Sequence, residues 1–201
     1  MINIDTVTYQ INDINYHKIE NDKSQIILAR SLRKNNYHIT RLKQKDFFKT
    51  KTWNTYTISR DGIVYQHYDN KYYSDFIGIK DVDIKSISIV LENMGSLFKT
   101  NDETYINWLN EICDSNNVKM KNWLGYKFWE NIPAKQLKNT ILLSQKLCDE
   151  HNILKKSIEF EYYHKETTNF NGIVFKSNYF ENSRDVHPLF NIQNFNKLLV
   201  K

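Results

Sequence analysis

The most informative segment of the sequence is Gly172-Ile-Val-Phe-Lys-Ser-Asn-Tyr-Phe-Glu-Asn-Ser-Arg-Asp-Val-His-Pro-Leu-Phe190. Its apolar run from Ile173 to Phe175 is typical of a buried strand, and a polar loop follows the run. Functional residues are often found on loops that a rigid strand positions. This loop therefore supplies the first candidate residues, Lys176, Asp185 and His187.

Four segments upstream have the composition of strands. Residues 25–29 and 84–91 are rich in Ile and Leu, and we interpret both as central strands. Within residues 53–66, Asp61-Gly62 separates two β-rich runs and predicts a hairpin with a two-residue turn, because Gly accepts a positive φ. Residues 2–11 alternate in polarity, which predicts an edge strand.

Helical spacing of apolar residues predicts three helices outside residues 102–130. The clearest covers residues 133–151, where Pro133 suits the first turn. A last helix is expected over 192–199 and a short one over 40–48.

Residues 102–130 are interpreted as an insertion. We expect Asp102 to cap a helix that carries Tyr105, Leu109 and Ile112 on one face. An aromatic connection containing Trp123 and Trp129 then follows. Its aromatic side chains suit either a docking surface or a core layer beneath the insertion.

The order of these elements predicts an α/β fold with a mixed central β-sheet flanked by helices. A chain of 201 residues suits one domain, here residues 1–201, with residues 1–24 as an N-terminal extension. The chain has only 5 Gly and 2 Pro, and no linker-like tract separates a second module.

Charge and cysteine content narrow the function only slightly. The net charge of +5 suits an anionic partner, but we favour the simpler interpretation of a solvated surface with excess lysine. No nucleic-acid-binding motif is present, so nucleic acid is not an expected partner. Cys113 and Cys148 are expected to be buried free thiols. We expect no signal peptide and no membrane span.

Four motifs, in the right order, resemble the zinc-dependent N-acetylmuramoyl-L-alanine amidases, the type 2 amidase and peptidoglycan-recognition-protein family, in its phage-type form. They are Ile26-Ile-Leu-Ala-Arg-Ser-Leu32, Tyr56-Thr-Ile-Ser-Arg-Asp-Gly-Ile-Val-Tyr-Gln66, Ser86-Ile-Ser-Ile-Val-Leu91, and Val174-Phe-Lys-Ser-Asn178 with Asp185-Val-His-Pro-Leu-Phe190. The resemblance covers residues 25–197 and implies the fold of that family. It also implies its reaction, cleavage of the amide between the muramic acid lactyl group and L-alanine.

The same resemblance implies that the metal site is degenerate. It places Ala29 and Lys176 at two zinc-ligand positions, Asp185 or His187 at the third, and Asn54 where the family has a tyrosine. A catalytic zinc needs three protein ligands, alanine offers no donor atom, and a lysine ammonium repels Zn²⁺. We therefore expect no cofactor and assign no catalytic residue. In place of the metal, we expect an ion pair between Lys176 and Asp185.

Two other active sites are considered. An active amidase with a rearranged zinc site would use Asp185 and His187 as residual ligands, but no His-x-x-x-His pair supplies the others. A triad of Ser177, His187 and Asp185 lacks the Gly-x-Ser-x-Gly turn around its serine.

The resemblance as a whole implies a catalytically degenerate amidase-like protein. Its expected role is that of a phage virion or tail-associated structural component, or of a cell-wall-binding component. Expected partners are other virion or structural proteins and peptidoglycan. The expected location is the virion or the host cytoplasm.

Overall fold

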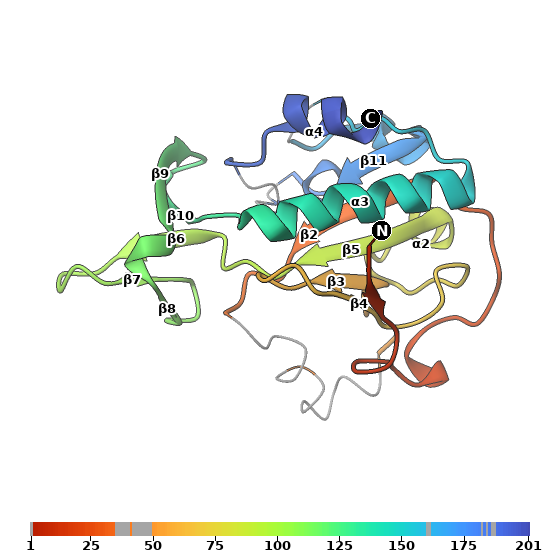
Figure 1. Ribbon diagram of the computed structural model, residues 1–201, viewed down its shortest axis with the longest axis horizontal. Coiled ribbons are helices and arrows are strands. Elements are labelled where there is room, and N and C mark those ends of the chain that lie inside the picture. Colours follow the sequence, from red (N-terminus) through yellow and green to blue (C-terminus); the bar gives the residue numbers. More distant parts are fainter. Residues whose placement is uncertain are drawn as a thin grey trace.

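The computed structural model describes residues 2–34, 41, 50–159, 162–181, 183, 185 and 188–201. Its main element is a six-stranded mixed sheet with the order β1-β4-β3-β5-β2-β11 (Figure 1). Helices pack against this sheet, so the predicted α/β fold is confirmed. The strands are β1 (Ile4–Asp5), β2 (Gln25–Arg30), β3 (Tyr56–Ile58), β4 (Val64–Gln66), β5 (Ser86–Leu91) and β11 (Gly172–Phe175).

The three strands predicted from apolar runs lie side by side in the middle of the fold. β2 pairs in parallel with β5 on one side and with β11 on the other. Every residue of these three strands is buried. Strands covered on both faces read as continuous apolar runs, which is why the sequence identified them.

The predicted hairpin is present as the antiparallel pair β3–β4, but its turn is one residue longer than expected. Ser59 N donates to Ile63 O, and Gly62 N donates to Ser59 O over 3.0 Å, so Arg60 and Asp61 occupy the turn centre. Gly62 follows them with a φ of 90°. A three-residue loop that ends in a left-handed glycine is a common hairpin connection, and it still needs the glycine.

The predicted N-terminal edge strand is much shorter than residues 2–11. Only Ile4 and Asp5 pair, in parallel with β4 at the edge of the sheet. The Asp5 carboxylate accepts hydrogen bonds from Val7 N and Thr8 N, each 2.9 Å long. Such a side-chain turn competes with strand pairing and ends the strand.

The segment interpreted as a helical insertion forms a second, antiparallel sheet instead. It projects from one end of the main sheet (Figure 1). The expected helix after Asp102 is wrong because turns interrupt it: Glu103 and Asn110 have φ values of 64° and 59°. The strand order is β8-β7-β6-β10-β9, with β6 (Ser96–Lys99), β7 (Tyr105–Ile106), β8 (Ile112–Cys113), β9 (Val118–Trp123) and β10 (Tyr126–Glu130).

Two of the predicted helices are confirmed, α3 (Ala134–His151) and α4 (Ile192–Leu199). Pro133 is the N-cap of α3 rather than part of its first turn. Residues 42–49 lie outside the described residues, so the helix expected over 40–48 stays a prediction. The remaining helices are α2 (Lys80–Lys85) and the short 3-10 helices η1 (Asp13–Asn15), η3 (Ser115–Asn117), η4 (Lys165–Asn169) and η5 (Lys176–Tyr179).

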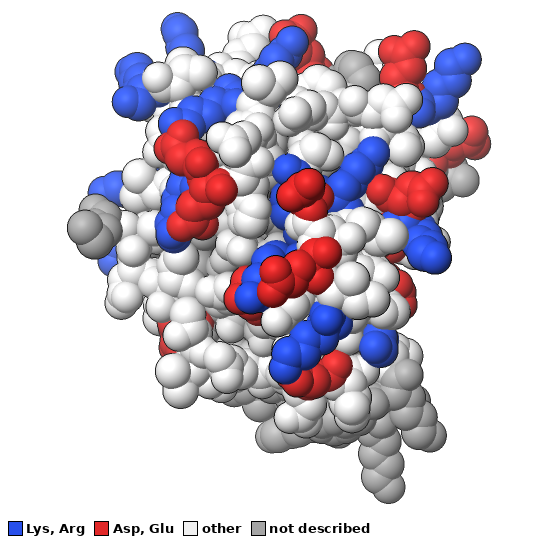
Figure 2. Space-filling model, turned by 90° about the vertical axis from the view of Figure 1, so that its right-hand side faces the viewer, with Lys and Arg blue, Asp and Glu red and all other residues white. Residues whose placement is uncertain are grey.

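Three further features concern the cysteines, membrane spanning and surface charge. Cys113 and Cys148 are buried free thiols, as predicted, and burial raises the pKa of Cys148 to about 11. Within the described part of the chain, no helix is long and apolar enough to cross a membrane. On the face shown in Figure 2, cationic and anionic side chains are interspersed, so the excess positive charge does not gather into one patch there.

Candidate functional site

Two of the positions that the amidase resemblance singles out lie at one edge of the main sheet. The last paired residues of β2 and β11 are Leu28 and Phe175. Because the two strands are parallel, Ala29 and Lys176 come next on neighbouring strands, at the same edge. The structure thus brings together two of the sequence-predicted site residues.

The expected ion pair between Lys176 and Asp185 is not formed. The Lys176 ammonium lies 4.9 Å from the centre of the Phe76 ring instead. Asp185 accepts a hydrogen bond of 2.9 Å from Ser183 Oγ. Among the described residues, no salt bridge joins Lys176 to a carboxylate. A ring face attracts a cation without the desolvation that a buried ion pair requires.

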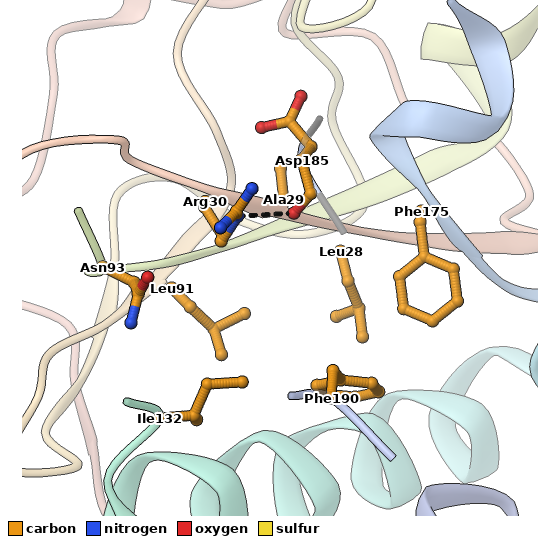
Figure 3. Close-up of a pocket in the computed structure, with 9 residues that line it drawn as sticks. All are labelled: Leu28, Ala29, Arg30, Leu91, Asn93, Ile132, Phe175, Asp185 and Phe190. Carbon is orange, nitrogen blue, oxygen red and sulfur yellow. Dashed lines mark hydrogen bonds between the residues drawn. The ribbon is translucent and has the colours of Figure 1, made fainter. Parts of the chain in front are cut away.

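Arg30, which the sequence analysis did not select, is the cation next to Asp185. Arg30 Nε donates a 2.7 Å hydrogen bond to the backbone carbonyl oxygen of Asp185 (Figure 3). The guanidinium is buried and lies 5.7 Å from the Trp129 ring centre. Burial lowers the pKa of Arg30 to about 10, and the nearby charges of Asp185 and Glu130 oppose that shift, so Arg30 remains charged at neutral pH.

The pocket beside these residues is small and mostly apolar. Ala29, Arg30, Asp185 and Asn93 line it together with apolar side chains (Figure 3). Its free volume of about 20 Å³ is close to the room that one water molecule needs. A substrate fragment therefore does not fit there. The apolar lining consists of Leu28, Leu91, Ile132, Phe175 and Phe190.

Asn54, at the position of the family's tyrosine, belongs to an interior hydrogen-bond network. Asn54 Nδ2 donates to Tyr56 O at 2.6 Å and to Thr57 Oγ1 at 2.7 Å, which uses both of its N–H groups. His67 Nδ1 lies 2.8 Å from Tyr9 O, and because a carbonyl only accepts, that nitrogen carries the proton. His67 Nε2 then accepts from Thr57 Oγ1 over 2.9 Å. Asn54 is 3% exposed and supports the hairpin.

A catalytic zinc does not fit the residues at this edge. Ala29 has no donor atom, Lys176 presents an ammonium, and the charged Arg30 lies on the same strand end. Within the described ranges, no group of three His, Cys, Asp or Glu side chains is placed to hold a metal. His187 lies outside the described residues, so its suggested role as a ligand stays a prediction.

The described residues do not form the suggested serine triad. Ser177 is in η5 with an exposed fraction of 0%, so its hydroxyl is closed to a substrate. The histidine of that triad, His187, is again outside the described residues.

Strong contacts anchor the second sheet beside this edge. Arg60, in the hairpin turn, makes two hydrogen bonds of 2.7 Å to the carboxylate of Glu130 on β10. Met94 N also donates to Glu130, and Gly95 lies so close to Arg30 that an added Cβ would be 2.8 Å from Nη1. The sequence marks the Arg-Asp-Gly turn as a hairpin connection, but it does not reveal Glu130 as the partner of Arg60.

No protein-family model and no curated protein sequence matches this chain. Its fold, however, is that of the N-acetylmuramoyl-L-alanine amidases, because solved structures of such proteins match it along nearly its whole length.

One similar structure is the N-acetylmuramoyl-L-alanine amidase LysC from Clostridium intestinale URNW, with 13% identity, a TM-score of 0.58, and coverage of 100% of this chain and 99% of that chain. A mutant endolysin from Bacillus subtilis has 17% identity and a TM-score of 0.58, with 99% of each chain covered. The amidase AmiD from E. coli, in complex with anhydro-N-acetylmuramic acid-L-Ala-D-gamma-Glu-L-Lys, has 13% identity and a TM-score of 0.55, covering 90% of this chain and 59% of that chain. At these identities the likeness is one of fold.

Proposed function

We propose that this protein is a catalytically inactive protein with the amidase fold that binds peptidoglycan, as a structural or wall-binding component of a phage virion. The observation that carries the proposal is the juxtaposition of Ala29 and Lys176 on neighbouring strand ends. A site with no donor at one position and a cation at the other disfavours a catalytic zinc. Without the metal, none of the described residues at this edge is placed to lower the pKa of an attacking water.

Peptidoglycan is the proposed partner because of the fold and of the cation at the edge. The fold is shared with AmiD, whose complex contains a muramyl peptide. Such peptides carry carboxylates, and the Lys176 ammonium, half-exposed beside Phe76, suits an anionic group. We propose the virion setting from the likeness to an endolysin.

The test has two readouts on the same preparation. Purified peptidoglycan sacculi are mixed with the protein and sedimented, and the supernatant is assayed for newly exposed L-alanine amino groups with zinc present. We expect co-sedimentation without release of amino groups. Zinc-dependent release would contradict the proposal and favour the rearranged amidase.

A matched pair of variants locates the contact. Lys176→Ala should weaken co-sedimentation, and the loss should shrink at high salt, because screened charges contribute less. Lys138→Ala is the control, since Lys138 is an exposed residue of α3 and does not belong to the sheet edge described above. Equal binding by both variants would exclude Lys176 as the contact while leaving wall binding itself measurable.

A further inference from the structure

A polar cavity lies at the end of the main sheet opposite to Ala29 and Lys176. Lys23, just before β2, lines one part of it, and Glu150 and His151 at the C-terminal end of α3 line another. This end of α3 lies on the side of the molecule away from the second sheet (Figure 1). The cavity volume of about 810 Å³ falls in the range of about 300–1,000 Å³ that is usual for small-molecule sites.

The buried Lys23 side chain is held by two backbone carbonyls. Lys23 is 5% exposed, and its Nζ donates hydrogen bonds of 2.8 Å to Tyr72 O and to Ile84 O. Both acceptors are uncharged, and burial lowers the pKa of the Lys23 ammonium to about 8. Near pH 8 about half of this side chain is therefore neutral amine, whereas a lysine with the ordinary pKa of about 10.4 is neutral in less than about 1% of chains.

The same two hydrogen bonds orient the neutral amine. A neutral amine has two N–H groups and one lone pair, and the carbonyls of Tyr72 and Ile84 take up both N–H groups. Because the nitrogen is tetrahedral, its lone pair points away from both carbonyls. Lys23 lines the cavity, so a small molecule there can reach the nitrogen from the side that the carbonyls leave open. Desolvation of this kind activates lysine as a nucleophile toward carbonyl compounds.

The charges around the cavity select the kind of carbonyl compound. Three carboxylates, those of Glu20, Asp22 and Glu150, line it together with two lysines. The second lysine, Lys71, lies 2.9 Å from Glu20 Oε1 and is paired with it. The C-terminal end of α3 adds a partial negative charge. Anionic compounds such as keto acids and sugar phosphates are disfavoured there, and neutral aldehydes are not.

We propose that Lys23 is a modification site that forms a Schiff base with small neutral aldehydes in this cavity. The Nζ lone pair forms a bond to the carbonyl carbon, and the oxygen becomes a hydroxyl group by taking a proton from the nitrogen. The hydroxyl group then leaves as water together with the second amine hydrogen, and a C=N bond replaces C=O. The step consumes no oxidant or reductant. His151 lines the same cavity and can relay the protons, because burial lowers its pKa and keeps the imidazole neutral near pH 8.

The test labels the full chain with glycolaldehyde at about pH 8 in the presence of cyanoborohydride, which reduces the imine to a stable secondary amine. Peptide mass spectrometry then gives the labelling rate of each lysine. We expect Lys23 to react at least about tenfold faster than Lys71, because a larger share of it is neutral amine. Lys71 is the matched control, since it lines the same cavity, its side chain is 42% exposed, and its hydrogen bond to Glu20 raises its pKa.

Equal or faster labelling of Lys71 would overturn the proposal, because exposure would then set the rate. A Lys23 that reacts only after the chain is unfolded in urea would overturn it as well, because the amine would be closed to the reagent. Glyoxylate, an anionic aldehyde of similar size, tests the ligand class. Relative to the urea-unfolded chain, Lys23 should react less with glyoxylate than with glycolaldehyde, and equal ratios would contradict the preference for neutral aldehydes. Neither result depends on the proposed wall binding.

Discussion

Arg30 Nε and the backbone carbonyl of Asp185 are joined by a 2.7 Å hydrogen bond across 155 residues of sequence. This contact ties the loop after β11 to the end of β2. It puts a permanent cation beside the positions at which the resemblance implied a metal. The positive charge that we expected Lys176 to supply beside Asp185 is therefore supplied by Arg30. Its guanidinium is hydrogen-bonded to the backbone carbonyl of Asp185 rather than to the carboxylate.

We predict that Arg30→Met lowers the free energy of unfolding by about 1–3 kcal/mol, because the partly buried Asp185 carbonyl loses a charged donor. Urea denaturation monitored by tryptophan fluorescence measures the change. Lys18→Met, which removes a cation from the exposed pair with Asp13, is the control and should change stability by less than about 1 kcal/mol. An Arg30 variant as stable as the unchanged protein would mean that the contact does not hold the loop.

The link between the hairpin and the second sheet gives a second prediction. The Arg60 and Glu130 side chains are only 15% and 5% exposed, and two hydrogen bonds join them. Removing one partner leaves the other charge buried, so Arg60→Met and Glu130→Gln should each cost about 3–5 kcal/mol. The double variant should cost much less than the sum of the two. A double-mutant cycle measures the coupling, and strictly additive effects would contradict this account.

Much of the main sheet was predictable from sequence, and much of the site was not. β2, β5 and β11 are covered on both faces and read as apolar runs, and Gly62 marks the hairpin because its φ of 90° demands glycine. The second sheet was mistaken for a helix because its turns depend on local side-chain contacts. One example is the pair of hydrogen bonds from Leu109 N and Glu111 N to Asn107 Oδ1.

Some site residues were likewise predictable from sequence motifs, and others were not. Ala29 and Lys176 were found because each occupies a motif position, and the parallel register then places them side by side. Arg30 was missed because its partner is a backbone carbonyl in a distant loop, which leaves no trace in side-chain patterns. The Lys176 partner was wrongly assigned because Phe76 lies in a loop that no motif marks.

We predict that the protein loses stability in mild acid because His67 is buried. Burial lowers its pKa to about 4, although its hydrogen bond to Tyr9 O opposes the shift. Between about pH 4 and the ordinary value near 6.5, the unfolded chain binds more protons than the folded chain, so stability falls as the pH falls. The full difference amounts to at most about 3 kcal/mol.

The control for this prediction is His67→Gln, which has no titrating group at that position. Asp83 acts in the opposite direction, because burial raises its pKa to about 6 and the folded chain then holds the proton more tightly. Comparing the two proteins at each pH cancels the Asp83 contribution. Parallel stability curves for the two proteins between pH 4 and 7 would show that His67 is not the group responsible.

A gain-of-ligand prediction concerns the sheet edge itself. Ala29→His with Lys176→His restores donor atoms on two neighbouring strand ends. We expect zinc to bind this double variant more tightly than it binds the unchanged protein. The readout is the rise in melting temperature on adding zinc, since a metal that binds only the folded state stabilises it. An equal rise in the unchanged protein would argue against a lost metal site.

The most direct test of the central claim is the zinc content of the unchanged protein, purified with zinc present, dialysed, and measured by elemental analysis. The account predicts a zinc content near zero, because Ala29 offers no donor and Lys176 and Arg30 present positive charge at that edge. A content near one zinc per chain would contradict it and show that other residues supply a metal site.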